Sequence, residues 1–408
     1  MLKNILYSLI YALSYQMVHS FYLFKHFEYM GYKSEGISVF TAIITVFFII
    51  LPLWILPKIK GFLEIAFTYL YLLLYIPVVI TFLNHYNNLG ELVYYQGIFL
   101  IGFILIFAPS ILTKKKYQPL NDKVLPTEGL IILNLFILFV LLFYFRNSFD
   151  IVDFSNVYKH RAEVKISNSF IAYLLLWNTY LIGPLVLIHG LIKRNKFFFI
   201  LGLLSLISAY GMTASKISLF IPLVIVASFL LMQRTEKIYR SFALSLTSIM
   251  LIVFAFADKF FMLSAVILMR TFGISGLLTY QYNEYFQTFP ITFLSHINII
   301  NYLTGWYPYD QPLGFVVSDF FGDSYNANAN FWATDGIAGF GIFGVLIISL
   351  VVGFFLSQIK RIERQENTKL LSLTIIPFCF IILNVSFFTA LISGGFIMVP
   401  IYFLIYRK

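Results

Sequence analysis

Long apolar runs, separated by short polar segments, make up most of this 408-residue chain. A helix needs roughly 20 apolar residues to cross the ~30 Å hydrocarbon layer of a membrane. We expect twelve such helices, so the pattern predicts an all-α, multi-spanning membrane helix bundle that forms one integral domain over 1–408. The expected spans lie at about 4–24, 37–57, 62–83, 91–112, 129–145, 169–191, 197–212, 216–232, 241–257, 335–357, 370–390 and 395–406.

One segment, 258–334, breaks this pattern because it is polar and aromatic together. We predict that it forms a large extracytoplasmic loop between the ninth and tenth spans, with a binding surface at the membrane face. Its stretch from Phe261 to Leu278 is apolar enough to span, but Arg270 at its centre makes insertion cost about 2.5–3.5 kcal/mol. We therefore expect an amphipathic or partly re-entrant helix there, and no thirteenth span.

Basic residues orient the bundle. If the chain begins in the cytoplasm, most of the 28 Lys and Arg residues fall in cytoplasmic segments. Such segments carry an excess of Lys and Arg in membrane proteins. The distribution predicts that both termini are cytoplasmic and that the 258–334 insert lies outside.

Composition supports this class and excludes others. The chain is 60% hydrophobic and 11% charged, whereas soluble domains carry about 25% charged residues. The net charge of +10 follows the cytoplasmic segments, so it does not indicate nucleic acid as a partner. The single cysteine, Cys379, excludes a disulfide framework and a cysteine metal site.

Three basic residues on the predicted outer side are candidates for binding an anion. Lys216 lies in the tight turn 211–216 between two apolar helices, Arg270 has apolar neighbours, and Arg161 lies in a polar loop. Arginine offers a fork of N–H donors that fits phosphate oxygens, so a lipid-linked diphosphate is the anion we favour. An ordinary interpretation also exists for Lys216 and Arg161, because cationic side chains at span ends extend to the lipid headgroups.

Aromatic rings of the insert, such as Trp306 and Trp332, suit the apolar faces of sugars, although an interfacial aromatic belt explains such residues as well. Motifs for ATP hydrolysis, metalloproteases and serine hydrolases are missing from the sequence. Asp319 and Asp323 lie four residues apart without a histidine beside them. We therefore expect no metal and no cofactor.

Several features occur together: about twelve spans, the turn Thr213-Ala214-Ser215-Lys216 before an apolar helix, one large late outer loop, and the stretch NANANFWATDGIAG at 326–339. This combination resembles bacterial oligosaccharide repeat-unit polymerases, the O-antigen and capsule polymerases, which are similar to the O-antigen ligases. Members often carry Ser-Arg where this chain has Ser215-Lys216. The ligases often carry His-Asn where this chain has Asn328-Ala329-Asn330.

The resemblance implies an enzyme that joins polyprenyl-diphosphate-linked repeat units into a polysaccharide at the outer face of the bacterial inner membrane. Lipid-linked oligosaccharides are the implied donor and acceptor, and a flippase and a chain-length regulator are the implied partners. The residues expected to bind diphosphate and glycan are Arg161, Lys216, Arg270, Asn328, Asn330, Trp306 and Trp332.

Transfer from an activated lipid diphosphate needs positive charge at the phosphate oxygens and a base for the proton of the acceptor hydroxyl. We expect Arg161, Lys216 and Arg270 to supply the charge. His296 is our first choice as the base and Glu284 our second, while an ordinary hydrogen-bonded loop histidine is the alternative interpretation of His296. The next candidates for the base are Asp319, Asp323 and Asp335.

Other functions stay open. A lipid-linked oligosaccharide flippase would also have about twelve spans, but its cations should line a central cavity and its two halves should be similar. We see no repeat between the halves, and the spans are poor in charge. A ligase-like glycosyltransferase is a further alternative, and a structural or signalling membrane protein explains the aromatic insert less well.

Overall fold

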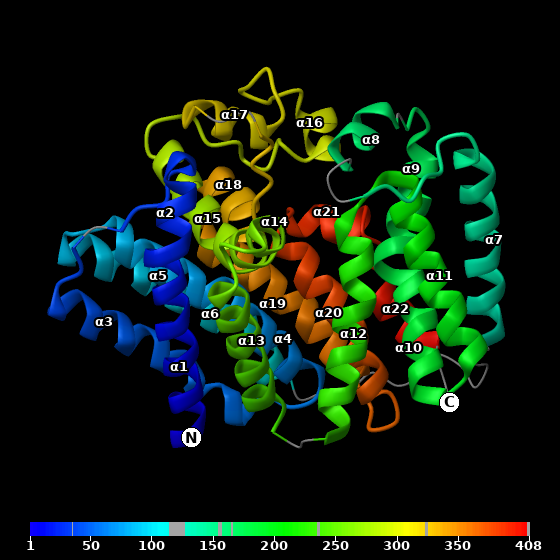
Figure 1. The fold of residues 1–408 in the computed structure, drawn as a ribbon, viewed down its shortest axis with the longest axis horizontal. Coiled ribbons are helices and arrows are strands. Elements are labelled where there is room, and N and C mark those ends of the chain that lie inside the picture. The colour runs from blue at the N-terminus through cyan, green and yellow to red at the C-terminus, as the bar shows by residue number, and fades with distance from the viewer. Residues whose placement is uncertain are drawn as a thin grey trace. The chain divides into compact units, whose positions relative to one another are not determined.

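A computed structural model of the chain describes residues 1–34, 36–113, 127–153, 157–164, 166–234, 237–322 and 325–405. Asp323, Lys165 and the end of the last predicted span, residue 406, lie outside this part of the chain. The regular elements of the described residues are all helical. Packing divides the chain into two compact units, which Figure 1 shows. Unit 1 comprises Met1–Thr113, Lys237–Gln358 and Ile382–Phe388, and unit 2 comprises Lys114–Glu236, Ile359–Ile381 and Thr389–Lys408.

Each unit combines helices from distant parts of the sequence. The described α-helices of unit 1 are α1 (Leu2–Val18), α2 (Phe24–Phe27), α3 (Val39–Ile50), α4 (Phe62–Leu70), α5 (Ile76–His85), α6 (Leu89–Leu112), α13 (Ile238–Ala255), α14 (Phe261–Ser264), α15 (Ile274–Phe286), α16 (Asn298–Thr304), α17 (Leu313–Phe320) and α18 (Ala338–Phe340). Those of unit 2 are α7 (Thr127–Phe145), α8 (Val157–Glu163), α9 (Ser169–Trp177), α10 (Gly183–Lys193), α11 (Lys196–Thr213), α12 (Lys216–Arg234) and α22 (Met398–Ile405). The remaining three, α19 (Gly344–Ile362), α20 (Thr368–Ile382) and α21 (Phe387–Ile392), contain residues of both units.

Several helices are interrupted by tighter or wider turns. A π-helical turn, whose hydrogen bonds reach one residue further than those of an α-helix, is frequent at functional sites. The π-helical segments are η1 (His19–Leu23), η5 (Tyr71–Tyr75), η6 (Asn178–Ile182), η7 (Ala265–Gly273) and η8 (Trp332–Ile337). The 3₁₀ segments are η2 (Glu28–Met30), η3 (Leu51–Trp54) and η4 (Leu56–Lys58).

Ten of the described helices are long and apolar enough to cross a membrane, which supports the predicted multi-pass helical membrane protein. Nine of them correspond to predicted spans: Val39–Lys58, Phe62–His85, Leu89–Leu112, Thr127–Phe145, Ser169–Lys193, Lys196–Thr213, Lys216–Gln233, Ile238–Ala255 and Gly344–Ile362. The predicted spans at 4–24, 370–390 and 395–406 are not among the ten. The expected number of twelve is therefore not reached.

The tenth helix, Phe261–Phe286, corrects our expectation of an amphipathic or re-entrant segment. It is 26 residues long, and 56% of its most apolar window is buried inside the protein. Its polar side chains are used internally: Thr279 Oγ1 donates to Ser275 O at 2.7 Å, and Gln281 Nε2 donates to Met30 O at 2.9 Å. Polar groups bonded within a bundle are tolerated at membrane depth, so this segment has the length and composition of a span.

Polar residues at the edges of the apolar runs begin several of these helices. Asn88 accepts hydrogen bonds from the first backbone N–H groups of α6, Asn195 does the same for α11, and Ser38 for α3. Such side chains satisfy backbone donors that have no partner inside the helix. The local sequence therefore determines where these spans start.

The part of the insert that follows α15 lies at one end of unit 1. Figure 1 shows α16 and α17 at this end, beyond α15 and α18, whereas the N-terminus of α1 lies at the opposite end. The membrane and the orientation of the termini stay predictions.

Candidate functional site

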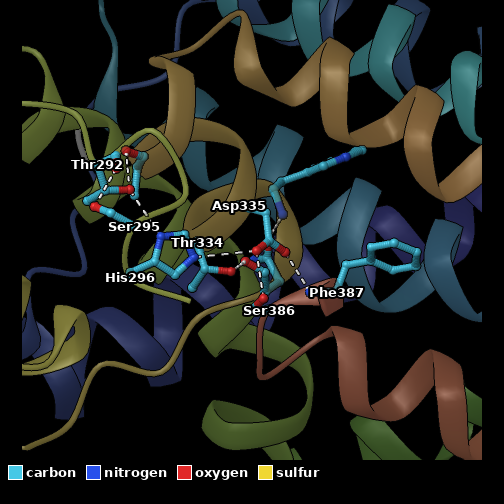
Figure 2. A network of polar contacts seen from close by, with 10 residues as sticks. Thr292, Ser295, His296, Thr334, Asp335, Ser386 and Phe387 are labelled. Carbon is cyan, nitrogen blue, oxygen red and sulfur yellow. Dashed lines mark hydrogen bonds and ion pairs between the residues drawn. The ribbon is translucent and has the colours of Figure 1, made fainter. Parts of the chain in front are cut away.

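Residues from three segments of unit 1 meet in a polar network around Asp335, which Figure 2 shows. Thr292 and His296 follow α15, Asp335 lies in η8, and Ser386 and Phe387 lie at the start of α21. His296 Nδ1 is 3.0 Å from Thr292 Oγ1, and its Nε2 is 3.4 Å from Asp335 Oδ1. Ser386 Oγ donates to Asp335 Oδ1 at 2.6 Å. The backbone N–H of Phe387 donates to Asp335 Oδ2 at 2.5 Å.

Asp335 is a fully buried carboxylate, with 0% of its side chain exposed. Burying a carboxylate is costly unless its oxygens accept hydrogen bonds or pair with a positive charge. Both oxygens of Asp335 accept bonds from the start of α21, where the N-terminal end of a helix favours negative charge. This contact also accounts for the break in the predicted span 370–390, since the chain leaves α20 at Ile382 and becomes helical again at Phe387.

The turn before His296 is strained and firmly attached. Phe293 and Leu294 have φ values of 46° and 64°, in the left-handed region, which costs about 1–3 kcal/mol for a residue other than glycine. The backbone N–H of Thr292 donates to Ala338 O at 2.7 Å, and that of Phe293 donates to Gly339 O at 3.1 Å. The backbone of α18 therefore determines where His296 lies.

The hydrogen bonds of Thr292 determine which contacts the ring of His296 can make. Thr292 Oγ1 donates its only proton to Ala338 O at 3.0 Å, so it can only accept from His296 Nδ1. Nε2 of the same ring faces Asp335 Oδ1, and the side chain of His296 is only 8% exposed. Both sides of the ring therefore face polar groups of the protein.

Glu284 and Arg270, the other predicted catalytic residues, have different surroundings in unit 1. Glu284 accepts hydrogen bonds from Tyr86 Oη at 2.6 Å and from Gln287 Nε2 at 3.2 Å. Burial raises the pKa of the Tyr86 phenol, and Glu284 raises it further. The side chain of Arg270 is exposed on η7, and its guanidinium carbon lies 5.8 Å from the centre of the Tyr325 ring. Neither residue has a contact with His296 among the bonds and ion pairs of the described residues.

The predicted sugar-binding residues divide into exposed and buried ones. Asn328 is exposed, and Trp306 is 43% exposed. Asn330 is fully buried: its Nδ2 donates to Ser275 O and Thr279 Oγ1, and its Oδ1 accepts from the backbone of η8. Trp332 is also 0% exposed, and its Nε1 donates to Ser349 Oγ at 2.8 Å. Asn330 and Trp332 hold helices together, and Trp332 presents no ring face to a sugar.

Unit 2 contains a cavity of about 410 Å³ at the turn between α11 and α12. Arg161, Thr213, Ser215 and Tyr180 line one part of it, and apolar residues such as Leu175 line the rest. The predicted tight turn is confirmed, since α11 ends at Thr213 and α12 begins at Lys216. Lys216, in the first position of α12, is partly buried.

Arg161 is attached to this turn. Its Nη2 donates to Ala214 O at 2.9 Å, and Ala214 has a φ of 50° in the left-handed region. The bond uses one of the five N–H donors of the guanidinium. The turn therefore orients a positive charge at the wall of the cavity.

A comparison with protein-family models, with curated proteins and with solved structures finds no match. Among the residues that the structure describes, no group of three or more His, Cys, Asp or Glu side chains is arranged to hold a metal ion. The candidate sites therefore rest on the geometry of this chain.

Sequence reasoning placed His296 at a site but missed its partner Thr292 and Ser386, the partner of Asp335. It ranked Asp335 only among the reserve candidates for the base. Each had a signal in the sequence. Thr292 precedes His296 by four residues, and Ser386 interrupts an apolar run. Neither signal indicates by itself that the two segments meet.

Proposed function

We propose that this chain is a membrane glycosyltransferase that polymerises polyprenyl-diphosphate-linked oligosaccharide repeat units at the outer face of the bacterial inner membrane. The observation that carries the proposal is the contact between His296 and the buried Asp335. A histidine oriented by a carboxylate is the arrangement that removes a proton from a hydroxyl nucleophile. The resemblance to repeat-unit polymerases supplies the class of substrate.

In the proposed reaction, His296 takes the proton of a hydroxyl on the acceptor glycan. The acceptor oxygen then forms a bond to the anomeric carbon of the donor, and the bond from that carbon to the lipid diphosphate breaks, so the diphosphate leaves with the electron pair. Asp335 Oδ1, 3.4 Å from Nε2, stabilises the imidazolium. The hydroxyl of Thr292, 3.0 Å from Nδ1, orients the ring.

Positive charge at the diphosphate is the second requirement. The cavity of unit 2 combines Arg161 and hydroxyl groups with apolar side chains, which suits a diphosphate that carries a hydrocarbon chain. Its volume of about 410 Å³ lies within the usual range of ligand pockets, about 300–1,000 Å³. We assign diphosphate binding there to Arg161, with Lys216 at the adjoining turn.

The division into units supports an enzyme over a transporter built from repeats. In such transporters the two halves of the sequence form similar bundles. Here unit 1 takes segments from the beginning, the middle and the end of the chain. The units are therefore not the two halves of the sequence.

The test is the surface glycan of cells that lack this chain, with and without a plasmid that restores it. Polymerase activity predicts single repeat units in the deletion strain and long chains after restoration. If the deletion instead removes surface glycan completely and traps lipid-linked units on the inner side, the protein moves the substrate across the membrane. Unchanged chain length would rule out polymerisation.

A further inference from the structure

Unit 1 contains a second group of polar residues, remote in sequence from the insert, around His19 in η1. His19 is 0% exposed, and both of its ring nitrogens lack a hydrogen-bond partner among the described residues. Its ring centre lies 6.2 Å from that of Tyr15, 5.6 Å from that of Tyr32 and 6.5 Å from that of His85. A histidine without partners inside a membrane protein indicates a functional site.

Polar atoms near His19 are also buried with unused hydrogen-bonding capacity. Tyr32 Oη and Gln281 Oε1 are also buried without a hydrogen-bond partner in the described structure, and the buried Tyr15 Oη and Thr81 Oγ1 have at most each other. Leaving so many buried polar atoms unpaired would cost as much as the whole net stability of a typical domain. A bound ligand that supplies the missing hydrogen bonds would remove this cost.

Electrostatic effects show that these side chains act on one another. Burial raises the pKa of the Tyr32 phenol well above its usual range, the phenols of Tyr15 and Tyr325 raise it further, and the positive charge of Arg270 lowers it. The group thus extends from Tyr15, on α1, towards Arg270, on η7.

Glycines leave room for two of the hydroxyls. A Cβ atom at Gly273 would lie 2.6 Å from Tyr32 Oη, and one at Gly276 would lie 2.2 Å from Thr81 Oγ1. Both distances are too short for a real contact. The small residues of η7 and α15 therefore allow the hydroxyl groups to face the group around His19.

Both ring nitrogens of His85, beside His19, lie close to backbone carbonyl oxygens. Its Nδ1 is 2.7 Å from Thr81 O, and its Nε2 is 2.9 Å from Gly31 O. A carbonyl oxygen only accepts hydrogen bonds, so a ring with a proton on both nitrogens satisfies both contacts. The centre of the Tyr280 ring lies 3.9 Å from that of His85, close enough to stabilise a cation by its π electrons.

Titratable groups lie on the surrounding elements. They are Tyr15 on α1, His19 on η1, Tyr32 in the following loop and Tyr280 on α15, while Glu284 on α15 bonds to Tyr86, the neighbour of His85. Hydroxyl, imidazole and amide groups that both donate and accept are suited to water, which forms about three hydrogen bonds when buried. They are poorly suited to a metal ion, which prefers carboxylates or thiolates beside histidine.

We propose that unit 1 encloses a hydrated proton-binding site, in which bound water bridges His19 to Tyr15, Tyr32, Thr81 and Gln281 and in which His85 holds the proton. The ligands are water and one proton, which converts a neutral imidazole into a cation. The site is independent of the proposed glycosyl transfer, since none of its residues belongs to the His296 network.

The experiment uses the full-length protein, labelled with ¹⁵N in its six histidines, in lipid bilayers at neutral pH. Solid-state NMR distinguishes an imidazolium, with two protonated nitrogens, from a neutral ring with one, and single substitutions assign the signals. We expect an imidazolium signal that is lost in His85→Gln and persists in His19→Phe. A single protonated nitrogen on His85 would overturn the proton site.

The same sample tests the water by transfer of magnetisation from solvent protons to the ring nitrogens. The matched control is His189, which is 1% exposed and whose Nε2 bonds to Tyr402 Oη at 2.7 Å within unit 2. We expect transfer to His19 to be severalfold faster than transfer to His189, and to slow severalfold in Tyr15→Phe or, if that variant does not fold, in Thr81→Val. Equal rates for His19 and His189 in the unsubstituted protein would show a dry cluster and overturn the proposal.

Discussion

In unit 1, both oxygens of Asp335 accept hydrogen bonds from the protein, and His296 is held between Thr292 and this carboxylate. In unit 2, Arg161 makes one bond to the turn after α11 and lines a cavity of about 410 Å³. The first site is closed, because each of these contacts is made within the protein. The second leaves space beside an oriented cation. A closed network suits proton transfer, which needs fixed geometry, whereas an open cavity suits the binding of an anion.

The largest expected effect comes from removing the base of the closed network. In His296→Ala, chain extension should fall by about 10²–10⁴-fold, the usual contribution of a general base, while the amount of protein in the membrane stays the same. Asp335→Asn should also slow extension, because the amide cannot stabilise an imidazolium as a carboxylate does. The measurement is the length distribution of surface glycan, together with binding of a lipid-diphosphate analogue, which should persist.

His26→Ala is the matched control for this prediction. His26 is a partly buried histidine of α2 whose ring contacts Tyr22 and Phe261 and which lies outside the Asp335 network. It should leave glycan length unchanged. Normal extension by His296→Ala would show that the His296–Asp335 contact is structural, and Glu284 would then be the next residue to test.

An intermediate effect is expected in the open cavity. Arg161→Ala should weaken binding of farnesyl diphosphate to the purified protein about 10- to 100-fold, because hydrogen bonds to a charged group contribute about 1.5–3 kcal/mol each. Lys216→Arg should retain binding, since the charge is kept. Lys159→Ala, an exposed residue of the same helix α8, serves as the control. Equal weakening in Arg161→Ala and Lys159→Ala would indicate general attraction of anions to a basic surface.

The smallest expected effect is a difference in thermal stability between a variant of the Asp335 network and a variant of the cavity. Ser386→Ala removes one donor from the buried Asp335, and leaving such a group short of a partner costs about 1–3 kcal/mol. Ser215→Ala changes a side chain at the wall of the cavity, where solvent can replace the lost bond. Thermal melting of the purified variants should therefore show a lower midpoint for Ser386→Ala only. Equal midpoints would mean that the network around Asp335 is not closed.

Much of the helical fold is readable from the sequence because length and hydropathy act locally. The predicted spans 91–112 and 197–212 correspond to α6 and α11, and the break at Ala214 and Ser215 is where the sequence places it. The prediction for Phe261–Phe286 is wrong because it rests on the insertion cost of Arg270 alone, whereas other polar residues of this helix, Thr279 and Gln281, are bonded to other segments. Their partners are 51 and 251 residues away in sequence, so no local pattern reveals them.

The same reason limits prediction of the candidate site. Trp332 is of a residue type that suits the apolar face of a sugar. Its ring, however, stacks on that of Phe99 inside unit 1, with ring centres 5.5 Å apart. Asp335 and Ser386 are 51 residues apart, and only the path of the chain brings them together. The residue types indicate which side chains could bind a sugar or a proton, whereas their burial in the fold determines which of them a substrate can reach.

The π-helical turns affect how this chain aligns with a homologous sequence. Asp335, Arg270 and His19 each lie in such a turn. Each residue of an α-helix advances the side chains by about 100° around the axis. A homologue that lacks one residue in such a turn would present a different face of the helix from that point on. An alignment that forbids single-residue gaps within helices would therefore pair Asp335 with the wrong position.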